Sequence, residues 1–173
     1  MKKILLVGES WISNATHFKG WDQFSSTTFH LGAEELISSI DSSKFKIEYL
    51  TSHDAAKDLP SEIEDLQKYN AIIFSDVGSN TLLLHPNVWI HGETFPNRLK
   101  LVKKYVELGG SFLMVGGYLS FQGINGSARY KTTAIEDLLP VDILPYDDRV
   151  EVPEGFNITI QNDHHPILNG LAG

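Results

Sequence analysis

Cysteine is absent from all 173 residues of the sequence. This excludes disulfide bonds, thiolate metal ligands and catalysis by a thiol nucleophile. Long apolar runs are also absent, since no stretch reaches the roughly 18 residues that a membrane-spanning helix needs. Positive charge is scarce, because 14 Lys and Arg residues stand against 22 Asp and Glu residues, for a net charge of -8. Nucleic acids and anionic membranes attract excess positive charge, so we expect neither as a partner.

The two ends of the chain carry different signals. The N-terminal stretch MKKILLVGES has a short apolar run without a small-residue cleavage site, which is typical of a first strand rather than a signal peptide. Without an export signal, we expect a cytoplasmic protein. With 42% hydrophobic residues, the chain is long enough for one domain with a substantial core. The final stretch HHPILNGLAG resembles the approach to another element, so we expect a single domain over residues 1–173 that lacks a C-terminal piece.

Short apolar segments alternate with amphipathic ones along the first two thirds of the chain. The apolar segments predict strands near residues 3–8, 45–50, 70–75 and 111–116. This alternation predicts an α/β fold in which right-handed crossovers place helices on both faces of a mostly parallel sheet. In the last third, short apolar runs at residues 141–144, 150–152 and 157–160 predict a small antiparallel extension at one edge of the sheet.

Helix boundaries follow from capping signals. A helix is predicted over Thr28 to Ile40, with Thr27 or Thr28 as its N-cap. Capping boxes are predicted at residues 61–64 (SEIE) and 133–136 (TAIE). A strong helix is predicted between Pro96 and Gly109.

Polar residues follow three of the predicted strands. Ligands of open parallel sheets bind at the carboxyl ends of the strands, so we expect Glu9, Asp76, Gly117 and Tyr118 to border one cavity. The alternative is that these polar residues only satisfy loop backbone groups. The full set of predicted ligand-binding residues is Glu9, Ser10, Asp76, Asn80, Gly117, Tyr118, Ser120 and Arg129. Tyr130, beside Arg129, is a further candidate.

The strand at Phe112 to Val115 runs directly into Gly116 and Gly117. A strand that ends in a sharp glycine-flanked turn is where many α/β enzymes present a nucleophile. Here Tyr118 occupies the exposed position. A phenol has a reference pKa of roughly 10, so it is a poor nucleophile at neutral pH unless it is activated.

Four segments carry a family resemblance: ILLVGESW, SDVGSNTLLL, GGYLSFQGINGSARY and LPYDDRVEVPEG, in this order. Together they resemble the family called putative glutamine amidotransferases, within the class I glutamine-amidotransferase-like superfamily, and are similar in plan to ThuA-like proteins. The resemblance covers nearly the whole chain and implies a flavodoxin-like three-layer sandwich. Working members of the superfamily carry Gly-x-Cys-x-Gly at the turn that Gly116 to Ser120 occupies here, so Tyr118 replaces the cysteine.

Two classes of function remain open. The first is a module for assembly or for binding a small molecule, either a carbohydrate or a carboxylate. The second is a hydrolase or isomerase that uses Glu9 and Asp76 as acid and base. The candidate catalytic residues are therefore Glu9, Asp76 and Tyr118. We predict no cofactor and no metal site, since none of the seven histidines forms a His-x-x-x-His pair.

Apolar loops predict a homo-oligomer. The connection from Thr81 to Phe95 carries six large apolar residues between Leu82 and Ile90, so we expect part of it at a subunit contact or over the sheet edge as a lid. A cluster of aromatic residues could form a sugar platform or anchor its loop to the core: Trp11, Phe18, Trp21 and Phe24. Arg149 could anchor a ligand, but its acidic neighbours favour ion pairing at the surface.

Overall fold

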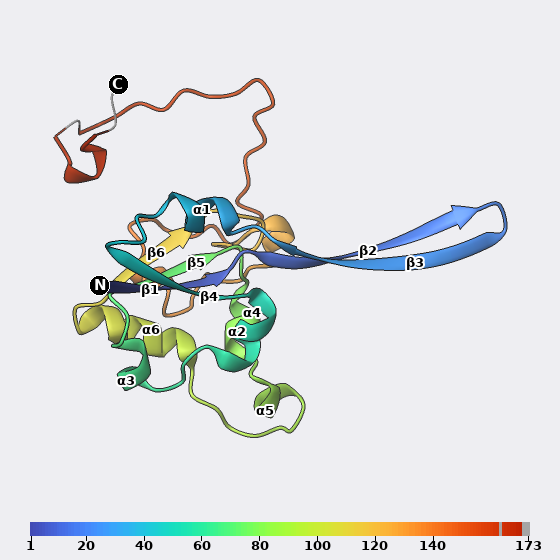
Figure 1. The fold of residues 1–173 in the computed structure, drawn as a ribbon, viewed down its shortest axis with the longest axis horizontal. Coiled ribbons are helices and arrows are strands. Elements are labelled where there is room, and N and C mark those ends of the chain that lie inside the picture. The colour runs from blue at the N-terminus through green and yellow to red at the C-terminus, as the bar shows by residue number, and fades with distance from the viewer. Residues whose placement is uncertain (163, 171–173) are drawn as a thin grey trace.

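The computed structural model describes residues 1–162 and 164–170. Its centre is a parallel sheet in the order β4-β1-β5-β6, shown in Figure 1. The strands are β1 (Lys2–Gly8), β4 (Phe45–Leu50), β5 (Ala71–Ser75) and β6 (Ser111–Val115). All three strand pairs are parallel, and β1 pairs with both β4 and β5. The four strands lie where the sequence predicts them.

The strand order identifies the fold. Numbered among themselves, the four parallel strands have the order 2-1-3-4, which is that of flavodoxin-like sheets. The order reverses between β1 and β5, which are adjacent in the sheet although β4 separates them in the chain. Such a switch point leaves a crevice outside the carboxyl ends of the two strands, where flavodoxin-like proteins bind their ligands.

Helices cover both faces of the sheet, as predicted. Successive residues of β1 point to opposite faces: Leu5 and Val7 enter the larger core, and Leu6 enters a smaller one with Ala33 and Ile73. Helix α1 (Glu34–Ser39) lies over the smaller core, which Ile37 covers. The larger core is covered by α2 (Ser52–Asp58), α3 (Ile63–Leu66), α4 (Ser79–Leu83) and α6 (Arg98–Glu107).

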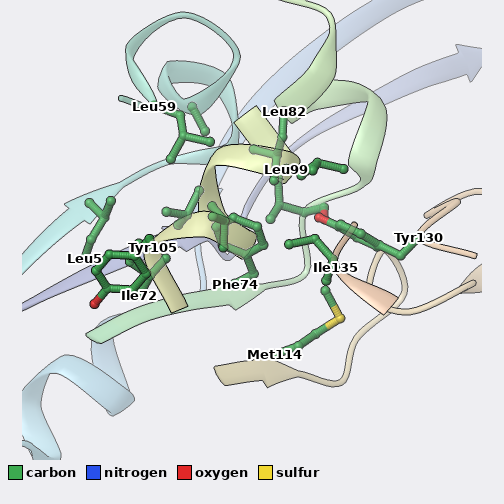
Figure 2. Packing of buried hydrophobic residues seen from close by; sticks show 14 of the residues in the cluster. Leu5, Leu59, Ile72, Phe74, Leu82, Leu99, Tyr105, Met114, Tyr130 and Ile135 are labelled. Carbon is green, nitrogen blue, oxygen red and sulfur yellow. The ribbon is translucent and has the colours of Figure 1, made fainter. Parts of the chain in front are cut away.

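The larger core extends into the loops that follow β6. Figure 2 shows Phe74 and Met114 of the sheet beside Tyr130 and Ile135 of these loops. The Tyr130 hydroxyl donates a hydrogen bond to the Val77 carbonyl at 2.7 Å, and burial raises the pKa of this phenol. Because Tyr130 is fully buried, it anchors the loop after β6 to the sheet and is unsuited to the ligand-binding role considered for it.

A long hairpin replaces the predicted start of the first helix. Strands β2 (Ser10–Lys19) and β3 (Asp22–Leu31) pair antiparallel and form a separate two-stranded sheet. The helix predicted from Thr28 is therefore wrong at its beginning, since β3 continues to Leu31 and α1 starts at Glu34. The reason is tertiary pairing: the Thr27 hydroxyl donates to the Asn14 side chain at 2.8 Å, and β-branched residues suit a pleated strand.

Both predicted capping boxes are wrong. Helix α3 has Glu62 as its N-cap and no side-chain cap. The second segment forms only the 3-10 turn η2 (Glu136–Leu138), and its Thr133 hydroxyl donates to the Tyr130 carbonyl. The Glu136 carboxylate instead accepts from the Thr132 and Ile143 backbone amides.

The helix predicted after Pro96 is present as α6. Its N-cap is Asn97, whose side chain accepts from the Lys100 amide at 3.0 Å. Gly109 ends it with a left-handed φ of 97°, as predicted. The preceding apolar connection is also partly helical, since it contains the end of α4 and the short helix α5 (Pro86–Trp89).

The three strands predicted in the last third are absent from its described residues. This part contains 3-10 turns, including η1 (Ile124–Gly126) and η3 (Pro166–Leu168), and otherwise irregular chain. The segment beyond residue 150 leaves the body of the molecule in Figure 1, and its Ile158 side chain is exposed. Short apolar runs form strands only where a neighbouring strand offers hydrogen bonds, and this segment meets none in the described structure. None of the described helices is long and apolar enough to cross a membrane.

Candidate functional site

Two carboxylate residues occupy the switch point with strained backbones. Glu9 directly follows β1 and Asp76 directly follows β5, and their φ angles are 49° and 47°. A left-handed conformation in a non-glycine residue costs of the order of 1–3 kcal/mol and is concentrated at functional sites. Tyr118 is not among the residues with positive φ. Glu9 and Asp76, and not Tyr118, therefore have the left-handed backbone directly after a strand of the parallel sheet.

Contacts with neighbouring strands fix Glu9. Its amide donates to the Ser75 carbonyl at 2.7 Å, and the Ser75 hydroxyl donates to the Glu9 carboxylate. The Glu9 carbonyl accepts from the Tyr49 hydroxyl and from the Gly32 amide, both at 2.8 Å. Strands β1, β4 and β5 and the end of the hairpin thus converge on this one residue.

Asp76 is held by the loop that follows β6. The Leu119 amide donates to Asp76 Oδ1 at 2.6 Å, and the Asp76 amide donates to the Ser120 hydroxyl at 3.2 Å. A Cβ atom on Gly117 would lie only 2.8 Å from Asp76 Oδ1, so a glycine is needed for this close approach. Helix α4 begins three residues after Asp76, at Ser79. Asp76 therefore lies in a strained strand-to-helix turn of the kind that the sequence suggests for Tyr118.

The two carboxylates face one open cavity of about 460 Å³. Its lining residues are Glu9, Asp76, Gly116, Gly117, Tyr118, Arg149, Val150 and Glu151. The four residues expected to border one cavity thus lie together. The Tyr118 side chain is 62% exposed, and the Arg149 guanidinium carbon lies 5.7 Å from the centre of its ring. The cavity combines carboxylate acceptors, one aromatic face and glycine backbone.

An acidic segment holds the rim of this cavity. Arg149 pairs with Asp147 at 2.9 Å and with Glu151 at 3.2 Å, which is the ion pairing that the sequence favours. Asp147 also accepts from the Asn125 amide at 2.8 Å. The Asp148 carboxylate accepts from the Gln122 and Gly123 amides at 2.7 and 2.8 Å. The sequence shows the run of acids but gives no sign of these backbone partners.

Acid is expected to release this rim only well below the usual range for an aspartate. Hydrogen bonds from Arg149 and from backbone amides lower the pKa of Asp147 below its ordinary 3.8. A lowered folded-state pKa gives stability that is complete above the unfolded-state pKa and is lost as the pH falls through the lowered value. The Asn125 amide shift, followed by NMR, should therefore still be native at pH 3.8. A change of this shift with a midpoint at or above pH 3.8 would contradict the prediction. Asp147→Asn should abolish the change that the unmodified protein shows at lower pH.

The other predicted ligand residues lie apart from this cavity. Ser10 is buried, and its hydroxyl accepts from the Ser52 amide at 2.8 Å. Ser120 is 3% exposed and lines a neighbouring cavity behind Gly117. Asn80 lines a further cavity with Trp89. Arg129 is exposed, with a left-handed φ of 60°. Ligand binding by these four residues remains a prediction, and the geometry gives Ser10 and Ser120 roles in holding backbone.

Comparisons with known proteins identify the family of this chain and two similar structures. The fold is a flavodoxin-like α/β sandwich, and the chain belongs to the family described as Putative glutamine amidotransferase, which it matches over residues 3–173. No curated protein matches it. The structure of Cytoplasmic Protein STM3548 from Salmonella typhimurium is similar, with 40% identity and a TM-score of 0.92, over 98% of this chain and 69% of that one. Cytoplasmic Protein STM1381 from Salmonella typhimurium LT2 has 41% identity and a TM-score of 0.84, over 92% and 66%.

These comparisons confirm the family that the four sequence segments resemble. The further similarity to ThuA-like proteins stays a prediction. The family description names a glutamine amidotransferase, whereas the chain has no cysteine at the turn after β6 or elsewhere. The functional groups that line the cavity are instead three carboxylates, a phenol, a guanidinium and glycine backbone.

Proposed function

We propose that this protein binds a neutral polyhydroxylated small molecule, of the carbohydrate type, in the cavity between Glu9, Asp76 and Tyr118. The observation that supports this proposal most directly is the pair of strained carboxylates at the switch point, which border the same cavity as an exposed aromatic ring. Strained residues persist only where the surrounding structure holds them, and at binding sites they present side chains that a relaxed backbone would turn away.

The charge of the cavity favours a neutral ligand over a carboxylate. Glu9, Asp76 and Glu151 contribute three carboxylates to its lining. The single guanidinium there, that of Arg149, is already shared with Asp147 and Glu151. An anionic ligand would be repelled, whereas hydroxyl groups donate strong hydrogen bonds to carboxylates. The Tyr118 ring offers the apolar surface on which a sugar ring can pack.

Calorimetric titration with neutral sugars and their matched sugar acids tests this proposal. We expect binding of at least one neutral sugar and weaker binding of its acid. Asp76→Asn should lower the affinity for the neutral sugar by about 10- to 100-fold, because hydrogen bonds to a charged group contribute about 1.5–3 kcal/mol. Asp58→Asn, on the exposed side of α2, is the matched control. Preference for the sugar acid would contradict the proposal.

Removing only the Tyr118 hydroxyl should have a small, measurable effect. Tyr118→Phe retains the ring, so we expect ligand binding to weaken by about 0.5–1.5 kcal/mol, the usual range for one neutral hydrogen bond. The same titration measures this change. Tyr146→Phe removes a hydroxyl from another exposed tyrosine outside the cavity lining and should leave affinity unchanged. An unchanged affinity in Tyr118→Phe would mean that the hydroxyl does not contact the ligand.

Glutamine should not be hydrolysed. Thiol-dependent hydrolysis needs an activated cysteine, and the chain has none. Incubation of the protein with glutamine should therefore release no ammonia above the buffer rate, and Tyr118→Phe should behave identically. Ammonia release by the unmodified protein, lost in Tyr118→Phe, would instead show that the phenol is a nucleophile.

A second candidate is a hydrolase or isomerase in which Glu9 and Asp76 act as acid and base. The strained strand-to-helix turn at Asp76 favours it, because such turns present catalytic groups in α/β enzymes. Glu9 borders the same cavity and accepts a hydrogen bond from Ser75 rather than from a backbone amide. Product formation from the bound sugar, retained binding in Glu9→Gln and loss of product in that variant would support catalysis over binding alone.

The expected surroundings of the protein fit the same proposal. A net charge of -8 supports a small-molecule ligand rather than nucleic acid or a membrane surface. We also propose a cytoplasmic location, which is supported by the word "Cytoplasmic" in the names of both similar structures. Fractionation of the source cells would measure it.

A further inference from the structure

The β2–β3 hairpin differs from the rest of the molecule in exposure and charge. It projects far from the body in Figure 1, and almost all of its side chains are exposed. Within the two strands, Lys19 and Asp22 are the only charged residues, and they face each other beside the turn. A lone two-stranded hairpin is marginally stable in water, and proteins normally protect long exposed edges with charge. This hairpin therefore has the features of a surface that another chain covers.

The aromatic cluster of Trp11, Phe18, Trp21 and Phe24 lies on this hairpin. None of the four lines the cavity between Glu9 and Asp76, where a sugar platform would lie, and none belongs to the buried core. Trp11 stacks on His30, and His17 stacks on Phe24, each pair across the two strands. Phe18 is largely exposed and Trp21, in the turn, is fully exposed. Exposed aromatic groups of this size mark protein interfaces rather than free surface.

A second cavity lies at the base of the hairpin. It has a volume of about 470 Å³. The His53 ring, which helps to line it, makes an edge contact with the Phe29 ring of β3 at 5.3 Å. Its other lining residues come from α2, from α4 and from the apolar Thr81 to Phe95 connection: Ser52, Ala56, Asn80, Thr81, Leu84 and Trp89. An aromatic side chain from outside would find mostly apolar walls here.

We propose that two copies of this chain associate through their hairpins, which lie antiparallel so that Trp21 of each enters the basal cavity of the other. An antiparallel arrangement about a two-fold axis places the tip of one hairpin beside the base of its partner's hairpin. The tip carries the exposed tryptophan and the base carries the cavity, so the two features meet without any change of fold. The same contact places Trp89 and Leu84, within Thr81 to Phe95, at the subunit interface.

Charge and area both favour a second copy as the occupant. The hairpin charges balance within one arm, so two arms do not repel one another, while the chain as a whole carries -8. Ten residues of strand span about 33 Å, and two paired strands are about 10 Å wide. One face of each arm packs on the other, which buries about 660 Å². Each inserted Trp21 buries a further 150–250 Å² or so and covers a similar area of cavity wall. The total is of the order of 1,300–1,600 Å², within the range of specific interfaces, about 1,200–2,000 Å².

Sedimentation equilibrium tests the proposal. The unmodified protein is expected to be a dimer at micromolar concentration. Trp21→Ala should raise the dimer dissociation constant about 30-fold or more, the effect of truncating a central tryptophan at an interface. Trp89→Ala should also raise it. Ile158→Ala, an equally apolar truncation on the exposed C-terminal segment, is the matched control and should leave it unchanged. A monomer at about 100 μM, or a dimer unaffected by Trp21→Ala, would overturn the proposal; about 100 μM is well above ordinary specific affinities.

Introduced cysteines test the geometry, because the chain has none of its own. A chain with Asp22→Cys, beside the tip, should form a disulfide-linked dimer when mixed with a chain carrying Asn80→Cys, at the basal cavity. The control partner is Ser43→Cys, an exposed position beside the N-terminus. Equal cross-linking to both partners, or cross-linking only to the control, would show that the tip does not reach the cavity. Neither sedimentation nor cross-linking depends on the cavity between Glu9, Asp76 and Tyr118. A negative result in either would therefore overturn the dimer and leave the proposed function untouched.

Discussion

Replacing Arg98 by methionine is expected to lower the free energy of unfolding by about 3–5 kcal/mol, because several buried carbonyls lose their charged hydrogen-bond donor. Arg98 is 0% exposed. No carboxylate accepts from its guanidinium in the described structure. The guanidinium donates instead to five backbone carbonyls, those of Ala55, Ala56, Leu59, Thr81 and Leu82. Burial lowers the pKa of this guanidinium to about 10, so it remains charged at neutral pH.

The size of the effect follows from the acceptors. The carbonyls lie at the ends of α2 and α4, where the last turn of a helix has no partners of its own. Among the five, only that of Ala55 also accepts from a backbone amide of the described residues, that of Leu59 at 3.4 Å. Methionine fills a similar volume but donates no hydrogen bond, so several buried carbonyls would lose their donor, at about 1–3 kcal/mol for each group left without one. Helices α2 and α4 carry part of the lining of the basal cavity, so the change should also weaken association of the two copies.

Urea unfolding followed by circular dichroism measures this change. The matched control is Lys100→Met, which removes a cation from the exposed side of the same helix. It should alter stability by less than about 0.5 kcal/mol, as surface substitutions do. An Arg98→Met protein within about 1 kcal/mol of the unmodified one would show that water or another group satisfies the carbonyls.

Replacing Gly8 by alanine is expected to destabilise the fold by about 3 kcal/mol or more, from backbone strain and overpacking together. Gly8 has a φ of 109°, which L-residues rarely adopt, and an added Cβ would overlap the Ser75 carbonyl oxygen. That oxygen accepts the hydrogen bond from the Glu9 amide. Displacing it would move Glu9 as well, so ligand affinity should fall together with stability.

Thermal unfolding and sugar titration together measure the Gly8→Ala effect. Gly116→Ala is the matched control for the melting temperature, because Gly116 also lies at the carboxyl edge of the sheet but an added Cβ there would meet nothing within 4 Å. We expect it to leave the melting temperature nearly unchanged. Equal effects of the two substitutions on the melting temperature would contradict the close approach of β1 and β5 as the reason for a glycine at position 8.

Part of the site could be predicted from the sequence because strand ends are local signals. The apolar runs before Glu9, Asp76 and Gly116 locate three strand ends, and parallel strands in one sheet place such ends at one edge. Strain could not be predicted in this way. The left-handed backbones of Glu9 and Asp76 arise from contacts with Ser75 and Leu119, which come from other strands and loops.

The sequence by itself determined the four parallel strands, the family and the absence of a thiol, because apolar runs, motif order and composition do not depend on partners far along the chain. Tertiary structure decided the rest. Thr28 belongs to a strand because β2 supplies its partner, Ser13, and the apolar run at 157–160 forms no strand because the described structure offers it none. Arg98 acquires its role only when two helix ends meet around it. Pairing and burial are non-local, and they override local propensity wherever the two disagree.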